Sequence, residues 1–115
     1  MTTRVIYQKL FNPQLLGTTA ALIYQLAATP ASLELRGARL RFVNITGAAV
    51  TFTVYAVPNG NTVNANNSFA TNVSVAAGSF FDIDVPVLGF GDALWALSGT
   101  ASAMVLQFMN GTLIQ

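Results

Sequence analysis

Hydrophobic and polar residues alternate most regularly in the segment Ala49–Pro58. Every second residue is apolar and falls on the same side of an extended strand: Val50, Phe52, Val54 and Ala56. Strict period-two alternation in β-branched and aromatic residues is typical of a strand with one buried face. Pro58 cannot donate a ladder hydrogen bond, and the turn residues Asn59 and Gly60 follow it. The pattern therefore predicts a strand that ends at Pro58.

Less regular versions of this pattern predict further strands on both sides of that segment. They are separated by turn residues and cover Arg4–Phe11, Ala20–Leu26, Ser32–Thr46, Phe69–Val75, Phe80–Val85, Ala93–Leu97 and Ala103–Met109. Gly37 interrupts the longest of them in the manner of a bulge or corner. No helix is predicted, because the short apolar runs would need strong capping and packing to be helical.

The connections and the buried faces follow from the same patterns. Thr46–Ala48 and Ser98–Thr100 are short turn segments, and we expect each to form a hairpin between the strands that flank it. The alternation places three sets of residues on buried faces: Leu22, Tyr24 and Leu26; Phe81, Ile83 and Val85; Met104, Leu106 and Phe108.

The predicted fold is all-β: a single-domain antiparallel β-sandwich of jelly-roll type with about eight strands. Strand spacing of roughly 8–12 residues is typical of sandwiches. A chain of 115 residues forms one domain that buries roughly two-thirds of its unfolded surface. We expect residues 1–17 to be an N-terminal arm or edge strand and residues 18–115 to be the sandwich domain.

Charge is scarce, and this narrows the choice of partners. Charged residues make up 8% of the chain, against roughly 25% in an average domain. The net charge of +1 gives no basic face for nucleic acid. A surface with little charge resists association poorly, so we expect other copies, as a dimer or trimer, or a partner protein to cover part of it.

The composition also excludes several classes of site. Cysteine and histidine are absent, which removes disulfides, thiolate metal sites and the commonest general base. Long apolar windows of the kind that span a membrane are missing, and the N-terminus lacks the apolar run of a signal peptide. We therefore expect no enzyme activity, no cofactor, no bound metal and no membrane partner.

Four motifs resemble a family of small structural proteins of tailed bacteriophages: Asn44–Gly47, Val50–Gly60, Val73–Gly78 and Gly91–Leu97. The similarity extends from about Thr19 to Ile114. It implies a capsid decoration, or cement, protein that binds and stabilises the assembled head shell. The implied partners are the major capsid protein and other copies of the chain, at the outer capsid surface of the virion after assembly in the host cytoplasm. The alternative is a tail or head-fibre component that contacts a receptor or glycan.

A pair of arginines and a pair of aspartates are the first candidate contact residues. Arg39 and Arg41 lie two apart on one predicted strand, and Asp82 and Asp84 lie two apart on another. They form ion pairs either within one subunit or across a subunit contact, where charge fixes register. The two carboxylates also have the spacing used by inverting glycosidases, and with Asp92 they suggest a calcium site. An outward acidic strand face accounts for them more simply.

Aromatic and amide side chains form a second set of candidates. Trp95, Phe80, Phe90 and Tyr55 suggest a platform on which a sugar stacks, although packing in the core or an interface is their commoner role. The polar segment Asn59–Ser68 is predicted to be an exposed loop. Together with the N-terminal segment and the charged strands, it gives the predicted partner contacts: Arg4, Tyr7, Lys9, Phe11, Arg36, Arg39, Arg41, Asn59, Asn61, Asn64, Asp82 and Asp84.

Overall fold

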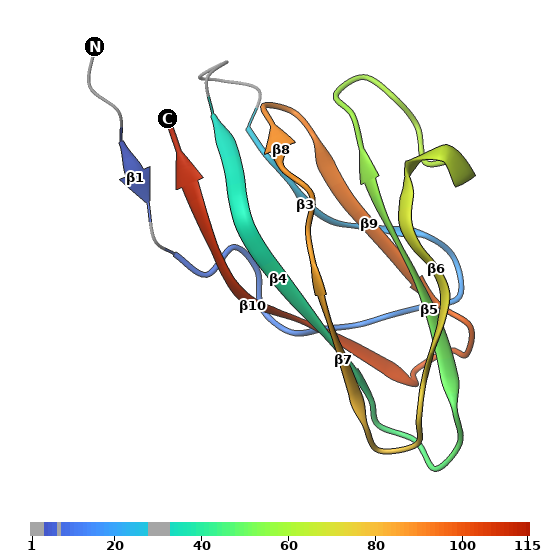
Figure 1. Cartoon of the computed structure of the whole chain (residues 1–115). Coiled ribbons are helices and arrows are strands. Elements are labelled where there is room, and N and C mark those ends of the chain that lie inside the picture. The colour runs from blue at the N-terminus through green and yellow to red at the C-terminus, as the bar shows by residue number, and fades with distance from the viewer. Residues whose placement is uncertain (1–3, 7, 28–32) are drawn as a thin grey trace.

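Two antiparallel sheets face each other in a computed structural model, which describes residues 4–6, 8–27 and 33–115 (Figure 1). Tyr7 and residues 28–32, including the start of the predicted Ser32–Thr46 strand, lie outside the described residues. The strands are β1 (Val5–Ile6), β2 (Gln14–Leu15), β3 (Ala21–Gln25), β4 (Glu34–Asn44), β5 (Val50–Val57), β6 (Ser68–Val75), β7 (Phe80–Asp84), β8 (Leu88–Gly89), β9 (Ala93–Ser98) and β10 (Met104–Ile114). One turn of 3-10 helix, η1 (Ala65–Asn67), precedes β6.

The order of the strands within the sheets is that of a jelly roll. The first sheet, sheet A, runs β1-β10-β4-β7, with β2 also paired to β10 and β8 also paired to β4. The second, sheet B, runs β3-β9-β5-β6. If β1 with β2, and β7 with β8, are each taken as one interrupted strand, consecutive strands alternate between the sheets except for β5 and β6. The predicted all-β sandwich is confirmed, and its topology is the two-sheet arrangement of jelly rolls.

The core lies between the sheets and is centred on two aromatic rings. Phe42 of β4 and Phe52 of β5 are fully buried, and their rings stack with centroids 3.7 Å apart and planes 5° apart. Leu40, Val54 and Leu106 are also fully buried around them. The alternation predicted for the central strand is therefore confirmed, because its apolar set faces sheet A across the core.

Both predicted hairpins are wrong. The segment after β4 leads to β5 in the other sheet, and the segment after β9 leads from sheet B to β10 in sheet A. A connection of three to five residues is long enough to cover the roughly 10 Å between packed sheets, so its length does not distinguish a hairpin from a crossing. The alternation of apolar and polar residues indicates that one face of a strand is buried, but it does not indicate which sheet the strand joins.

The prediction for Leu22 is also wrong. Its side chain is 47% exposed, whereas its neighbour Ile23 is 8% exposed and belongs to the core. The register between β3 and β9 shifts between Leu22 and Tyr24, so one extra residue occupies β3 at that point. A bulge of this kind reverses the facing of the residues before it, which a strict period of two does not anticipate.

A single buried polar side chain holds one end of the sandwich. The Asn44 amide nitrogen donates hydrogen bonds to Ala48 O (2.7 Å) and Val75 O (3.0 Å), and its Oδ1 accepts one from Thr46 N (2.9 Å). Asn44 is 1% exposed. These bonds join the crossing from β4 to β5 with the end of β6, and a longer bond of 3.3 Å from the same amide nitrogen reaches Ala76 O just beyond it.

We expect Asn44→Ala to lower the free energy of unfolding by about 2–5 kcal/mol, because several buried backbone groups lose their hydrogen-bond partner together. Urea denaturation followed by far-ultraviolet circular dichroism measures the change. Asn12→Ala, at an exposed position, is the matched control and should change the stability by less than about 0.5 kcal/mol. Equal stability of the two variants would contradict the role given to Asn44.

Candidate functional site

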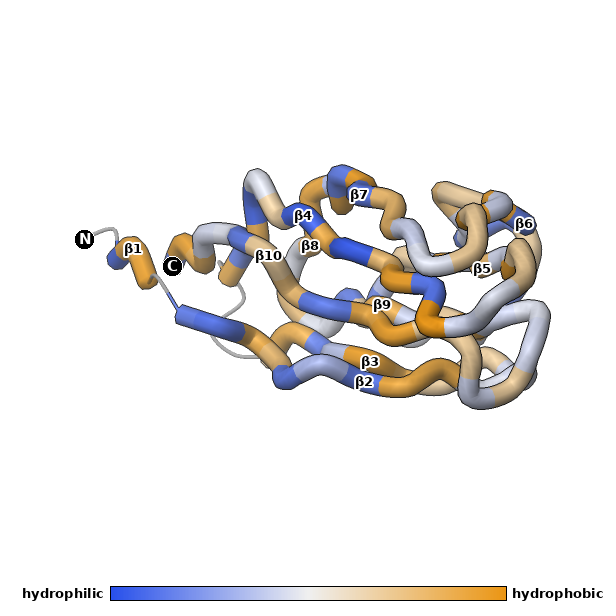
Figure 2. Tube along the Cα trace, turned by 90° about the horizontal axis from the view of Figure 1, so that it is seen from below, coloured by the Kyte–Doolittle hydropathy of each residue, from blue (hydrophilic) through white to orange (hydrophobic). Residues whose placement is uncertain are grey.

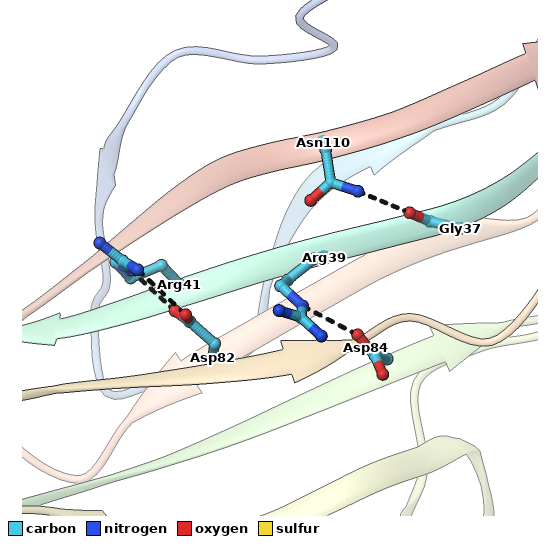
Figure 3. Close-up of polar contacts among 6 residues, drawn as sticks. All are labelled: Gly37, Arg39, Arg41, Asp82, Asp84 and Asn110. Carbon is cyan, nitrogen blue, oxygen red and sulfur yellow. Dashed lines mark hydrogen bonds and ion pairs between the residues drawn. The ribbon is translucent and has the colours of Figure 1, made fainter.

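The two predicted arginine–aspartate pairs lie on the outer face of sheet A. Register pairs Arg41 with Asp82 and Arg39 with Asp84, directly across β4 and β7. Arg41 Nε and Nη2 donate to the two carboxylate oxygens of Asp82 at 2.7 and 3.0 Å, and Arg39 Nε donates to Asp84 Oδ1 at 3.0 Å (Figure 3). Of the two predicted alternatives, the structure shows ion pairs within one chain.

The two pairs differ in how well they are shielded. The side chains of Arg41 and Asp82 are 30% and 26% exposed, whereas those of Arg39 and Asp84 are 51% and 78% exposed. The Arg41 guanidinium also lies 4.0 Å from the centroid of the Phe80 ring. The hydrogen bond from Arg41, helped by the charges of both arginines, holds the pKa of Asp82 below its ordinary value. The bidentate Arg41–Asp82 pair is therefore the tighter of the two.

Charged residues occur on the strands of sheet A and not on those of sheet B. Glu34 pairs with Arg36 on β4, and Arg4 and Lys9 belong to the N-terminal segment. Asp92 precedes β9 and is the last charge in the chain. The four strands of sheet B carry no charged residue. In Figure 2 the hydrophilic stretches of β4 stand out in blue on the sheet A side.

Large apolar side chains are exposed at the β7 edge of sheet A. Phe80 is 53% exposed and Phe81 41% exposed, and Ile45, just after β4, is 56% exposed. Phe81 belongs to the set predicted to face inward, and its ring does lie 5.8 Å from that of Phe52, but the edge position leaves it partly uncovered. Among the described residues, β7 has β4 as its neighbour on one side and no paired strand on the other. Sequence reasoning missed this edge, because Phe80 and Phe81 are adjacent and a strand pattern assigns them to opposite faces.

The predicted N-terminal contacts are only partly free. Arg4 is held by backbone hydrogen bonds to Gln115, and Phe11 packs against the rings of Tyr24 and Phe108 at centroid distances of 6.3 and 5.5 Å. Lys9 is exposed and borders an open hollow of about 350 Å³ beside the bulged part of β10. Tyr7 lies outside the described residues.

The loop predicted between β5 and β6 is present, and Asp92 fixes its start. Asp92 Oδ1 accepts a hydrogen bond from Asn59 N at 2.8 Å, and its Oδ2 accepts one from Gly89 N at 2.7 Å. Asn59 and Asn61 are exposed, whereas Asn64 caps η1 through a bond from Asn66 N. Asp92 is thus a loop anchor, a role that the sequence signals only through turn residues at Gly89 and Gly91.

The four aromatic residues proposed as a platform do not come together. Trp95 and Tyr55 are directly opposite each other on the outer face of sheet B. Phe80 lies on sheet A, and Phe90 lies in the turn before β9. Any stacking surface therefore involves Trp95 and Tyr55 and excludes the two phenylalanines.

The described residues show neither a cluster of metal-binding side chains nor a membrane-spanning helix. In residues 4–6, 8–27 and 33–115, no three histidine, cysteine or acidic side chains gather as metal ligands do. No helix in the same residues is long and apolar enough to cross a membrane. Asp82 and Asp84 are each engaged by an arginine, which leaves no free carboxylate pair on that strand.

The comparisons with known proteins reveal a shared fold. No protein-family model matches the sequence, and no curated protein matches it. A subunit of Bacillus endospore appendages, described as disulfide-linked pili, is similar in structure with a TM-score of 0.59 and 21% identity, over 99% of this chain and 89% of that chain. A chain of the infectious bursal disease virus particle is similar with a TM-score of 0.50 and 14% identity. That match covers 97% of this chain and 30% of the viral chain.

We expect the Arg41–Asp82 pair to make the stability depend on pH in the acid range. Because the folded pKa of Asp82 lies below its ordinary 3.8, the pair stabilises the fold above that value. The contribution is lost as the pH falls through the lowered pKa. Asp82→Asn should thus lower the melting temperature near neutral pH, and the difference from the wild type should shrink below about pH 4.

Thermal unfolding between pH 2 and 7 measures this difference. Asp84→Asn is the matched control, because it removes the more exposed pair with one hydrogen bond, and it should have the smaller effect near neutral pH. A difference between wild type and Asp82→Asn that stays constant down to pH 2 would rule the ion pair out as its source.

Proposed function

We propose that this chain is a structural subunit of a larger assembly, and that it decorates the head of a tailed bacteriophage. In this role it binds the assembled shell at the outer capsid surface, as dimers or trimers, and acts without catalysis. The resemblance of its turn and strand motifs to small tailed-phage structural proteins supports the location. The jelly-roll fold, which it shares with a pilus subunit and a virus particle chain, is compatible with a structural role.

The exposed edge of β7 is the observation that carries the proposal. Folded monomers usually protect a free edge strand with charges, prolines or a covering segment. Here Phe80 and Phe81 lie on the edge strand, next to Ile45, and more than 40% of each side chain is exposed. The nearest charges, Arg41 and Asp82, are already neutralised by each other. The Phe80–Phe81 end of this edge is apolar, and its nearest charges are paired with each other, so it is suited to permanent contact with another protein.

Stabilisation of a shell would follow from mass action. A protein that binds the assembled shell and not its separate subunits shifts the equilibrium toward the shell, and the shift grows with the concentration of free decorating protein. The subunit needs only a rigid scaffold and a complementary surface for this. The inter-sheet core around Phe42 and Phe52 provides the rigid scaffold.

A substitution at this edge tests the proposal. We expect Phe80→Ser to reduce co-sedimentation with purified head shells about tenfold or more, because a central aromatic anchor commonly carries 2 kcal/mol or more of binding energy. Met109→Ser is the matched control, since Met109 is also an exposed apolar residue of sheet A, at 41% against 53% for Phe80, but lies on β10. Unchanged binding of Phe80→Ser would contradict this use of the edge.

The number of copies per virion tests the location independently. Quantitative mass spectrometry of purified virions should give a ratio to the major capsid protein near one, or a simple fraction of it. A handful of copies would instead favour the tail or head-fibre alternative, and the absence of the chain from virions would remove both.

A second candidate is a subunit of a filament made from copies of this chain. Sheet A has unlike apolar edges on its two sides: Val5 (46% exposed) and Leu15 (55%) on β1 and β2, and the two phenylalanines on β7. Contact between unlike edges is heterologous and need not close into a ring. The similarity to a pilus subunit over nearly the whole chain also favours this candidate. These 115 residues contain no cysteine, so such a filament would not be disulfide-linked.

Electron microscopy and analytical ultracentrifugation of the purified chain separate the two candidates. A filament subunit should form concentration-dependent polymers alone, and Leu15→Lys should abolish them. A decoration protein should remain a small oligomer until shells are added.

A further inference from the structure

A small hollow lies on the outer face of sheet B, away from the apolar edges discussed above. Its volume is about 90 Å³. Trp95 and Leu22 are opposite each other across β9 and β3 and border one side of it. Gln25 of β3 and Asn61 of the β5–β6 loop also line it, while Val57 is almost fully covered. The hollow therefore combines an aromatic ring with two amide side chains.

The lining is uncharged, and this limits the ligand. No residue that lines the hollow is acidic or basic, and no strand of sheet B carries a charge. The nearby carboxylate of Asp92 already accepts hydrogen bonds from two backbone nitrogens. A charged ligand would lose its hydration here without gaining a counter-charge. An entirely apolar ligand would leave the amide groups of Gln25 and Asn61 without partners. A neutral ligand with one apolar face and several hydroxyl groups satisfies both conditions.

The hollow is also held in shape before any ligand arrives. Asp92 ties Asn59 to Gly89 through its two carboxylate oxygens, and Gln25 Nε2 donates to Gly91 O at 3.2 Å. Gly91 has a φ of +75°, and a Cβ at this position would lie 2.4 Å from the Asn59 side chain. Binding to a rigid rim costs little ordering of the protein, which favours even weak ligands.

From these observations we propose that the outer face of sheet B binds a neutral glycan at this hollow. One sugar ring lies against Trp95, where the C–H bonds of the ring meet the electron-rich aromatic face. The side chains of Asn61 and Gln25 exchange hydrogen bonds with its hydroxyl groups. A volume of 90 Å³ equals that of about three water molecules, so the hollow takes a substituent or one edge of the ring while the rest remains on the sheet.

Trp95 is the one tryptophan of the chain, so its fluorescence reports on this site alone. The probes are the neutral hexasaccharides of glucose (β-1,4- and α-1,4-linked) and of N-acetylglucosamine, with hexagalacturonate as the acidic comparison. We expect at least one neutral probe to change the emission saturably at micromolar to millimolar concentration, and the acidic probe to leave it unchanged.

Asn61→Ala is the test variant, because it keeps the tryptophan and the backbone bond from Asn61 N to Pro58 O. It should weaken binding about tenfold, as loss of one hydrogen bond to the sugar does. Asn66→Ala, an exposed residue of the same loop outside the hollow, is the matched control and should bind as the wild type does.

Trp95→Ala should abolish binding measured by calorimetry, with thermal unfolding as the check on its fold. The proposal is overturned if no neutral probe changes the emission of the wild type. It is equally overturned if binding occurs but Asn61→Ala and Asn66→Ala bind alike. Neither result affects the proposed decoration of a shell, which rests on the β7 edge.

Discussion

Two of the crossings between the sheets, from β4 to β5 and from β6 to β7, depend on the buried amide of Asn44. In a jelly roll almost every connection passes from one sheet to the other, so the ends of the sandwich carry many backbone groups outside the ladders. Asn44 supplies a donor or an acceptor to the segment after β4 and to the segment after β6 together. With this end fixed, the stacked rings of Phe42 and Phe52 fill the centre of the space between the sheets, and smaller apolar side chains fill the space around them.

The two sheets present different chemistry to their surroundings. Sheet A carries six of the nine charged residues, three acidic and three basic. They form ion pairs, Glu34 with Arg36 within β4 and the two arginine–aspartate pairs across β4 and β7, so the charges of its outer face cancel. The apolar groups that remain uncovered on this sheet lie at its edges. Sheet B is uncharged and presents hydroxyl, amide and aromatic groups. One molecule can therefore contact a protein through the rim of sheet A and leave sheet B open to a ligand of another kind.

The sequence was sufficient for the fold class, because alternation in segments such as Val50–Val57 depends on local geometry alone. It was insufficient for the connections, since a short turn after Asn44 serves a hairpin and a crossing equally well. The outward direction of the Leu22 side chain was not predicted, because it depends on a bulge in β3. That bulge arises from pairing with β9, a strand distant in sequence. Ion pairs between arginine and aspartate within one chain were one of the two predicted alternatives. A β-strand repeats every two residues, so Arg39 and Arg41 share one face of their strand, as Asp82 and Asp84 do on theirs. In the sequence, Asp92 looks like an ordinary turn residue. Its role in anchoring the loop is visible only in the structure, where its carboxylate accepts hydrogen bonds from Asn59 N and Gly89 N.

The backbone ends of the described chain meet at one end of the sandwich, where Arg4 N donates to Gln115 O and Gln115 N donates to Arg4 O (Figure 1). A short linker between these points would join β1 to β10 without crossing the molecule. The fold is therefore suited to circular permutation, with new ends placed in the exposed loop between β5 and β6. For the same reason, two peptides attached at Arg4 and at Gln115 would begin side by side. An array of such subunits would display them as a paired, regularly spaced layer.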